Sequence, residues 1–156
     1  MIRKHRREAE MALHGVSVQH NFETAHRLWT VPGKCQNLHG HSWKVEIMVE
    51  WTQLDARGMV IEYGELKKLF RGWIDTHFDH GTLLDGQDPL FHVFRGHDLK
   101  VYAFNGNPTV ERVAAEIAEV VTEDILPQVT NGAQVRLAGV TVSETATNSA
   151  FWAPLP

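Results

Sequence analysis

The 156-residue chain contains a single cysteine, so no disulfide bond can form within it, and a reducing compartment such as the cytoplasm is expected. It has no apolar run long enough to span a membrane, and its charged first fifteen residues lack the apolar core of an export signal. Internal repeats and low-complexity segments are also absent. The formal net charge of -4 argues against nucleic acid as the main partner. We therefore expect one globular domain with no membrane or nucleic-acid partner.

Histidine, in contrast, is abundant, with ten residues in a chain of this length, which favours metal or proton chemistry. His39 and His41 begin a segment in which apolar residues then alternate up to Trp51. Alternation of this kind predicts a strand, and side chains two apart on a strand point to the same face. The pair can therefore offer two nitrogen ligands to one metal ion.

A third ligand is expected from the segment 16–28, which alternates in the same way and carries His26 near its end. If the two strands pair antiparallel across the loop 29–38, His26 converges with His39 and His41. Three imidazoles with an open fourth position are typical of catalytic zinc, whereas structural zinc is usually closed by four protein ligands. The sequence thus predicts a zinc site at this end of the hairpin.

Three further features are open to more than one interpretation. Cys35 is a fourth zinc ligand, an inert core thiol or a catalytic base, and nearby zinc with Lys34 would favour its thiolate as a base. Asp79 and His80 are either a solvated pair or a proton shuttle in which Asp79 orients His80. Glu144 is either a surface carboxylate or a bidentate acceptor for a 2-amino-4-oxo pyrimidine edge.

The remaining pattern predicts an α+β domain with an antiparallel four-stranded sheet and two helices on one face. Residues 1–15 read as a flexible extension, and residues 16–156 form the domain. Amphipathic periodicity predicts the helices, and alternation predicts two further strands, with a bulge at Gly139. The helices span 63–76 and a segment that starts at Asn107-Pro108 and ends at Pro127; the strands span 134–144 and 150–152. Residues 82–107 read as a long loop with a short helix and an extended segment.

Several motifs, in this order along the chain, resemble the 6-pyruvoyltetrahydropterin synthase / 6-carboxytetrahydropterin synthase family. They run from about residue 16 to 152 and comprise Phe22-x-Thr24-Ala25-His26-Arg27-Leu28, Cys35-x-x-x-His39-Gly40-His41, Gly58-Met59-Val60-Ile61-Glu62-Tyr63-Gly64-Glu65-Leu66-Lys67, Asp79-His80, Asn107-Pro108-Thr109-x-Glu111 and Glu144-Thr145. The chain departs from the family pattern at Glu62-Tyr63, where Asp-Phe is common, at Phe78, where Leu is common, and in the long 82–107 loop.

The resemblance implies the tunnelling fold (T-fold), in which a homo-oligomer, expected to be a hexamer, closes its sheets into a β-barrel with active sites at subunit interfaces. It implies zinc bound by three residues, a catalytic triad that is shared between neighbouring subunits, an anchor for the pterin ring and a residue lining the pterin pocket. In this sequence the zinc ligands are His26, His39 and His41, the triad is Cys35 as proton acceptor with Asp79 and His80, the anchor is Glu144, and the pocket residue is Thr109.

Three residues between Cys35 and His39 make the chain similar to the bacterial 6-carboxytetrahydropterin synthases of queuosine (7-deazapurine) biosynthesis. The resemblance then implies conversion of 7,8-dihydroneopterin triphosphate to 6-carboxy-5,6,7,8-tetrahydropterin, acetaldehyde and triphosphate. Two alternatives remain: a 6-pyruvoyltetrahydropterin synthase, and a non-catalytic zinc- or pterin-binding T-fold protein in which Cys35 closes the metal site.

Overall fold

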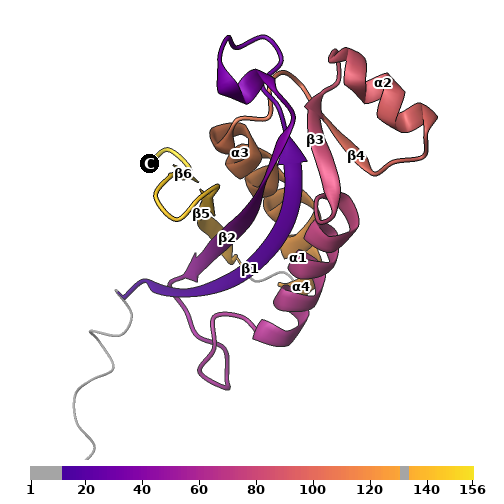
Figure 1. Ribbon diagram of the computed structural model, residues 1–156. Coiled ribbons are helices and arrows are strands. Elements are labelled where there is room, and N and C mark those ends of the chain that lie inside the picture. Colours follow the sequence, from indigo (N-terminus) through magenta and orange to yellow (C-terminus); the bar gives the residue numbers. More distant parts are fainter. Residues whose placement is uncertain (1–11, 131–133) are drawn as a thin grey trace, which may run out of the picture.

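The computed structural model describes residues 12–130 and 134–156, which form one curved sheet with helices packed against it (Figure 1). The strands are β1 (His14–His26), β2 (His39–Trp51), β3 (Gly81–Asp85), β4 (Val101–Phe104), β5 (Arg136–Ser143) and β6 (Ser149–Trp152). The α-helices are α1 (Tyr63–His77), α2 (Pro89–Gly96), α3 (Val110–Val120) and α4 (Leu126–Val129), with a 3-10 turn at Lys34–Gln36 and a π-helical turn at Val121–Ile125.

The long hairpin of β1 and β2 is the part of the fold that positions the site. The two strands pair antiparallel over thirteen residues each, from His14 opposite Trp51 to His26 opposite His39. Alternate residues of both strands are buried on one face, as the periodicity predicts, and the core includes Phe22 and Trp43, whose rings stack with centroids 5.9 Å apart. Burial of one face fixes the register, because a slip by one residue would expose every core side chain.

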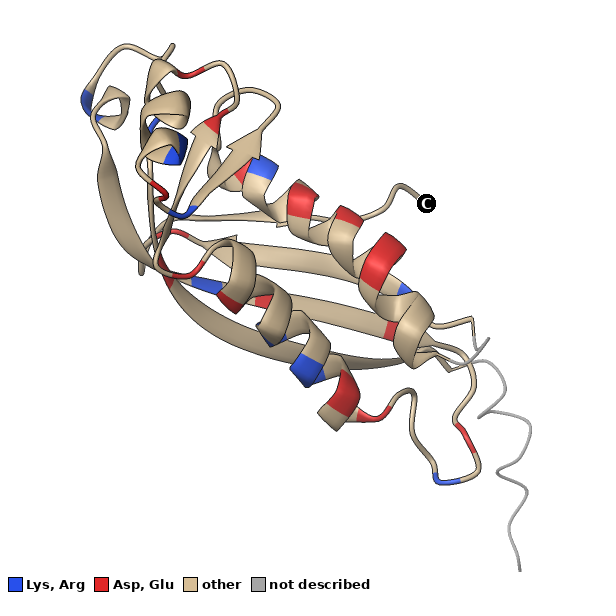
Figure 2. Cartoon of the chain, turned by 90° about the vertical axis from the view of Figure 1, so that its right-hand side faces the viewer, with Lys and Arg blue, Asp and Glu red and all other residues tan. Residues whose placement is uncertain are grey.

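Helices α1 and α3 lie across the same face of the sheet, as expected (Figure 2). Leu66, Phe70 and Ile74 recur at helical spacing in α1 and are buried against the strands. Charged residues recur along both helices (Figure 2), and several of them, such as Glu65, Lys68 and Glu111, are exposed. The helices leave the opposite face of β1 and β2 uncovered, where residues such as Lys44 and Met48 are exposed.

The four-stranded antiparallel sheet predicted from the sequence is wrong, since the sheet has six strands in the order β4-β3-β1-β2-β5-β6. The two additional strands, β3 and β4, lie in or next to the segment 82–107, which was predicted as a long loop with one short helix and one extended segment. The structure has the short helix, α2, but two strands, and β3 pairs parallel to both β1 and β4. Alternation does not reveal β3, because Thr82, Leu83, Leu84 and Asp85 are all buried. Strands covered on both faces lack the polar-apolar alternation that marks a half-exposed strand. Helix α2 joins β3 to β4 and packs against both.

The second predicted helix also differs at both ends. Thr109 rather than Asn107 is the N-cap of α3 and accepts a hydrogen bond from the Arg112 N–H, whereas the Asn107 side chain donates to Thr30. Pro127 does not end the helical segment. The π-helical turn precedes this residue, and Pro127 lies in the first turn of α4. Proline is tolerated there because the first N–H groups of a helix have no partner within it. The predicted bulge in β5 is confirmed, since Met48 pairs with Gly139 while Val49 pairs with Leu137.

The expected N-terminal extension lies mostly outside the described residues, and its last two positions, His14 and Gly15, belong to β1. Among the helices of the described part, none combines the length and the apolar character that crossing a membrane requires.

Candidate metal centre and active site

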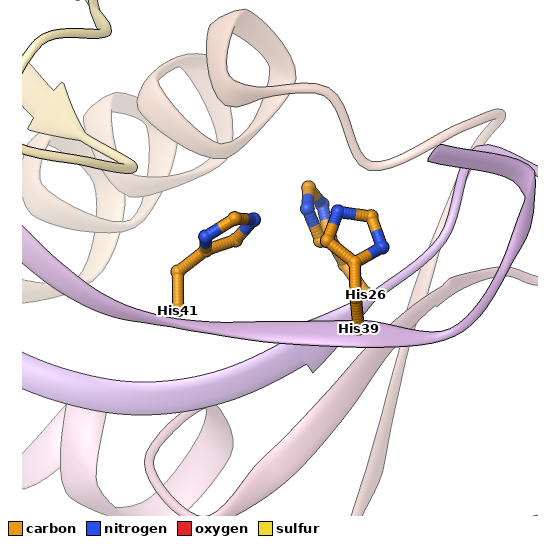
Figure 3. Close-up of side chains that lie close together, drawn as sticks. All are labelled: His26, His39 and His41. Atoms are coloured by element: carbon orange, nitrogen blue, oxygen red, sulfur yellow. The ribbon is translucent and has the colours of Figure 1, made fainter. Parts of the chain in front are cut away.

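The register of the hairpin brings together the three histidines that were predicted as metal ligands. His26 lies opposite His39, and Thr24 lies opposite His41, so the three imidazoles project from the same face at one end of the hairpin (Figure 3). One ligand nitrogen from each residue lies within 4.8 Å of the other two. The predicted convergence is therefore confirmed, and it follows from strand pairing rather than from proximity in sequence.

Packing holds the rings in this arrangement. The His26 ring is almost completely buried. It packs edge to face against Trp43, with ring centroids 5.0 Å apart, and the centroid of His41 lies 5.7 Å from that of Trp43. The centroids of His26 and His39 are 4.7 Å apart. Burial, aided by repulsion from His39 and His41, lowers the pKa of His26, although the Pro108 carbonyl and Glu144 act in the opposite direction. A lowered pKa favours the neutral imidazole, which is the form that binds a metal.

Hydrogen bonds to backbone carbonyls select the tautomers of two rings. His26 Nδ1 lies 3.0 Å from the Pro108 carbonyl oxygen, and His39 Nδ1 lies 2.7 Å from the Asn37 carbonyl oxygen. Because a carbonyl can only accept, each Nδ1 must carry the hydrogen, and each neutral ring then has a lone pair at Nε2. Metal-binding histidines commonly have this support, in which the other ring nitrogen donates to a carbonyl.

The Nε2 atoms of these rings are of the kind that bind a metal. His26 Nε2 and His41 Nε2 are buried and have no hydrogen-bond partner among the described residues. An unpaired polar atom in a protein interior costs about 1–3 kcal/mol, so their persistence calls for a partner of another kind. Three imidazoles whose ring nitrogens gather at one end of the hairpin suit zinc, so the ligand set fits the predicted ion.

Glu144, which the resemblance casts as the anchor for the pterin ring, lies at the same centre. Its Oε1 atom is 3.1 Å from His26 Nε2 and 3.6 Å from His41 Nε2. The residue follows β5 directly, and its backbone N–H donates to the Asn148 carbonyl across the turn that leads to β6. Its side chain is half-buried, at 21% exposed, and faces two imidazoles, which favours a role in the site over that of a surface carboxylate.

Cys35 is exposed, in the 3-10 turn within the loop that joins β1 to β2. Its thiol is not a member of the three-histidine group, and its carbonyl accepts a hydrogen bond from the Leu28 N–H at 2.7 Å. This placement excludes the inert core thiol. It leaves the thiol accessible for proton transfer, which is the role that the sequence favours.

Polar contacts that sequence reasoning missed attach the Cys35 loop to the rest of the fold. The Arg27 guanidinium binds both carboxylate oxygens of Asp88, with Nε at 2.6 Å, and Asp88 is completely buried. The Trp29 indole donates to Asp85 at 3.0 Å. Both acidic residues lie in the segment predicted as a loop, 56 and 61 positions away, so no local pattern could have found them.

Asp79 and His80 form a pair, with Asp79 Oδ2 at 2.6 Å from His80 Nδ1. Partial burial of Asp79 opposes ionisation, but hydrogen bonds from the Glu23 N–H and from His80 outweigh it, so the pKa of Asp79 lies below its ordinary value. The backbone of His80 is left-handed, with φ 53°, and its N–H donates to the Glu23 carbonyl at 2.7 Å. The pair is thus attached to β1, and the His80 side chain is 79% exposed.

A shallow hollow of about 340 Å³ lies beside this pair and is lined among others by Glu23, Ser42 and Gly81, the residue after His80. Of the three histidines, only His41 lines it. Within the described chain, no hydrogen bond or ion pair joins His80 to Cys35. The structure of one chain therefore brings together the three histidines and Glu144. It places Cys35 and the Asp79-His80 pair on separate segments near them.

The model of the family described as 6-pyruvoyl tetrahydropterin synthase matches residues 15–154, nearly the whole chain. The chain belongs to this family. Its similarity to a 6-carboxy-5,6,7,8-tetrahydropterin synthase from Rickettsia felis is 31% identity over 126 residues, which cover 80% of this chain and 88% of the relative. A probable enzyme of the same name from Halobacterium salinarum is 36% identical over 127 residues, covering 80% of this chain and 76% of the relative.

Solved structures confirm the fold. A 6-pyruvoyl tetrahydropterin synthase from Caenorhabditis elegans superimposes with a TM-score of 0.65 at 23% identity, covering 94% of this chain and 99% of that chain. An uncharacterized protein from Wolinella succinogenes gives a TM-score of 0.76 at 22% identity, over 91% of this chain and 98% of that chain. The fold of the single chain predicted from the motifs is therefore correct, with the change in strand number described above.

Proposed function

We propose that this family member is a zinc-dependent 6-carboxy-5,6,7,8-tetrahydropterin synthase. Its substrate is 7,8-dihydroneopterin triphosphate, and with one water it yields 6-carboxytetrahydropterin, acetaldehyde and triphosphate. The proposal of a metal rests on the group of three imidazoles, in which the Nε2 atoms of His26 and His41 are buried and have no hydrogen-bond partner among the described residues. The spacing of Cys35 from His39 and the names of the curated relatives support the carboxy product and, with it, a place in the cytoplasmic synthesis of a 7-deazapurine such as queuosine.

Zinc bound by His26, His39 and His41 would supply Lewis-acid chemistry, which acidifies carbon-bound hydrogens of a polarised side chain. The residues of the chain then move the protons. The Cys35 thiolate accepts a proton from the substrate side chain, and its exposed position on a loop allows the approach.

The other residues position the substrate and complete the proton transfers. His80 exchanges the complementary proton, and Asp79, whose lowered pKa keeps it ionised, holds the imidazole by Nδ1 and stabilises its charged form. Glu144 accepts the N–H groups of the pterin edge, which fixes the ring beside the metal. Thr109 contributes to the pterin pocket, at the N-terminus of α3 and next to the Pro108 carbonyl that orients His26.

We further propose a homo-oligomer, a hexamer in the simplest case, in which neighbouring subunits share the site. The strands at the two edges of the sheet, β4 and β6, have an unpaired side each, and open edges invite pairing with another chain. Phe151 on β6 is 79% exposed, as expected for a side chain that a second copy covers. The exposure of both Cys35 and His80 supports a triad that is completed across the interface.

The test is incubation of purified, zinc-loaded protein with 7,8-dihydroneopterin triphosphate, followed by mass analysis of the products. We expect 6-carboxytetrahydropterin together with acetaldehyde. A 6-pyruvoyl product would show instead that the chain is a 6-pyruvoyltetrahydropterin synthase. Absence of turnover with a folded, zinc-loaded protein would favour a non-catalytic pterin- or zinc-binding role.

A further inference from the structure

We propose that Glu144 is a displaceable fourth ligand of the metal, which binds the ion before the substrate arrives and leaves it to hold the pterin ring. This inference rests on the proposed function for the nature of the substrate. It differs from a site whose fourth position is always open, and from one that Cys35 closes. The group that faces His26 and His41 in the structure is the Glu144 carboxylate, whereas Cys35 is exposed on the loop that joins β1 to β2.

The first argument is the chemistry of the facing atoms. His26 Nδ1 must donate to the Pro108 carbonyl, so Nε2 of the neutral ring has only a lone pair to present. The atom that it faces at 3.1 Å is Oε1 of Glu144, and an ionised carboxylate only accepts. Two acceptors at this separation repel each other unless a cation or a proton lies between them. Because His41 Nε2 is also buried without a hydrogen-bond partner among the described residues and lies near the same oxygen, a single cation would satisfy all three atoms.

The second argument is the spacing of these atoms. In a tetrahedral zinc site with bonds of about 2.0–2.1 Å, neighbouring ligand atoms lie about 3.3–3.4 Å apart. The separations from Glu144 Oε1 to His26 Nε2 and to His41 Nε2 are 3.1 and 3.6 Å, on either side of that value. The spacing of Glu144 Oε1 from these two nitrogens is therefore close to that of neighbouring ligand atoms on one zinc ion, and carboxylate oxygen is an accepted zinc ligand.

The third argument is that the Glu144 side chain is free to move while its backbone stays in place. The backbone N–H of Glu144 donates to the Asn148 carbonyl at 3.0 Å, and this bond does not depend on the side chain. Among the described residues, the ion-pair contacts of the carboxylate are with the two histidine nitrogens, and the side chain is 21% exposed. A rotation about its side-chain bonds is therefore sufficient to exchange the metal for the N–H groups of a pterin.

This exchange would couple substrate binding to the metal. When the pterin edge takes the carboxylate, one coordination position becomes free beside the substrate side chain. Coupling between two ligands is reciprocal, so a pterin that competes for Glu144 must weaken zinc binding by the same factor by which zinc weakens pterin binding. A pterin without a side chain has no hydroxyl groups to replace the lost ligand, and it isolates this effect.

The experiment measures zinc affinity by competition with a chromogenic chelator, using the full-length protein. The variants are Glu144→Gln and Glu144→Ala, and the matched control is Glu46→Gln, which changes a carboxylate on the uncovered face of β2. We expect the zinc dissociation constant to rise by about tenfold or more in both Glu144 variants, as for other residues that support a metal site, and to change less than about twofold in the control. Circular dichroism checks that the variants are folded. Glu144→Asp keeps the charge on a shorter side chain, so its zinc dissociation constant should lie between those of wild type and Glu144→Gln.

A second titration, with unsubstituted pterin present at saturation, tests the exchange. Zinc affinity of the wild type should fall, whereas that of Glu144→Ala should not change. Equal zinc affinity in wild type and folded Glu144→Ala protein would overturn the inference, and would show that a proton rather than the metal occupies the space. If Glu144→Ala weakens zinc but pterin has no effect on the wild type, Glu144 is a permanent ligand and the exchange is wrong. Neither result depends on turnover, so failure of the proposed reaction is seen separately in the product assay.

Discussion

Replacing Arg27 with Ala should destabilise the fold more than any other single change in the loop that carries Cys35. The carboxylate of Asp88 is completely buried and accepts hydrogen bonds from Arg27 Nε and Nη2 and from the Leu90 N–H. Without Arg27 it keeps only the bond at the start of α2. A buried charge that has lost its partner is the costly outcome, because Arg27 is the only cation paired with Asp88 among the described residues.

The expected loss is about 3–5 kcal/mol of unfolding free energy, which is typical for removal of one member of a buried ion pair. Asp88→Ala leaves Arg27, whose side chain is 20% exposed and can regain some hydration, but it also removes the N-cap of α2, worth about 0.5–2 kcal/mol. The double variant Arg27→Ala, Asp88→Ala leaves no charge behind. It should therefore be more stable than the sum of the single effects predicts, by an interaction energy of about 1–3 kcal/mol.

Urea unfolding at one fixed protomer concentration measures these differences, since the stability of an oligomer depends on concentration. Arg57→Ala is the matched control, because Arg57 contacts Asp55 at the surface, where ion pairs contribute about 0–1 kcal/mol. We also expect turnover to fall in Arg27→Ala while zinc content stays near wild type, because the pair supports the Cys35 loop. A loss in Arg27→Ala no larger than that in Arg57→Ala, or strict additivity in the double variant, would refute the reasoning.

Four further outcomes are expected. His39→Ala should lose most of its bound zinc by metal analysis, and full stoichiometry would contradict its assignment as a ligand. Cys35→Ala should keep zinc and lose turnover by several orders of magnitude, whereas loss of zinc with the thiol would make Cys35 a ligand. Mixing inactive Cys35→Ala and His80→Ala proteins under subunit exchange should restore activity, and hetero-oligomers without activity would place the triad in one chain. The pKa of Asp79 is lowered in the folded state, so the ionised carboxylate stabilises the fold above the ordinary carboxyl range. This contribution is lost as the pH falls through the pKa of the folded state. The stabilities of wild type and Asp79→Asn, measured by acid unfolding, should therefore converge at low pH.

The sequence by itself determined the hairpin and its metal ligands. Alternation along two segments predicted which face is buried, and the parity of His26, His39 and His41 was enough to place all three rings on that face. These features are predictable because side-chain direction in a strand has a fixed period of two residues. Helix α1 and the bulge in β5 followed from local periodicity for the same reason.

The sequence did not reveal the features that depend on partners far along the chain. Strand β3 lacks alternation because the tertiary structure covers both its faces, and its parallel pairing with β1 requires a crossover that no local pattern encodes. The contacts from Arg27 and Trp29 to acidic residues more than fifty positions away depend on that pairing. The placement of the Glu144 carboxylate against His26 has the same origin, since β5 pairs with β2 and the turn after it then ends above the imidazoles. Periodicity fixes which face of a strand a side chain occupies. Only the pairing of distant strands decides which polar groups lie together on that face. This pairing places the Glu144 carboxylate beside the histidines, where we propose that it is a fourth ligand of the candidate metal centre.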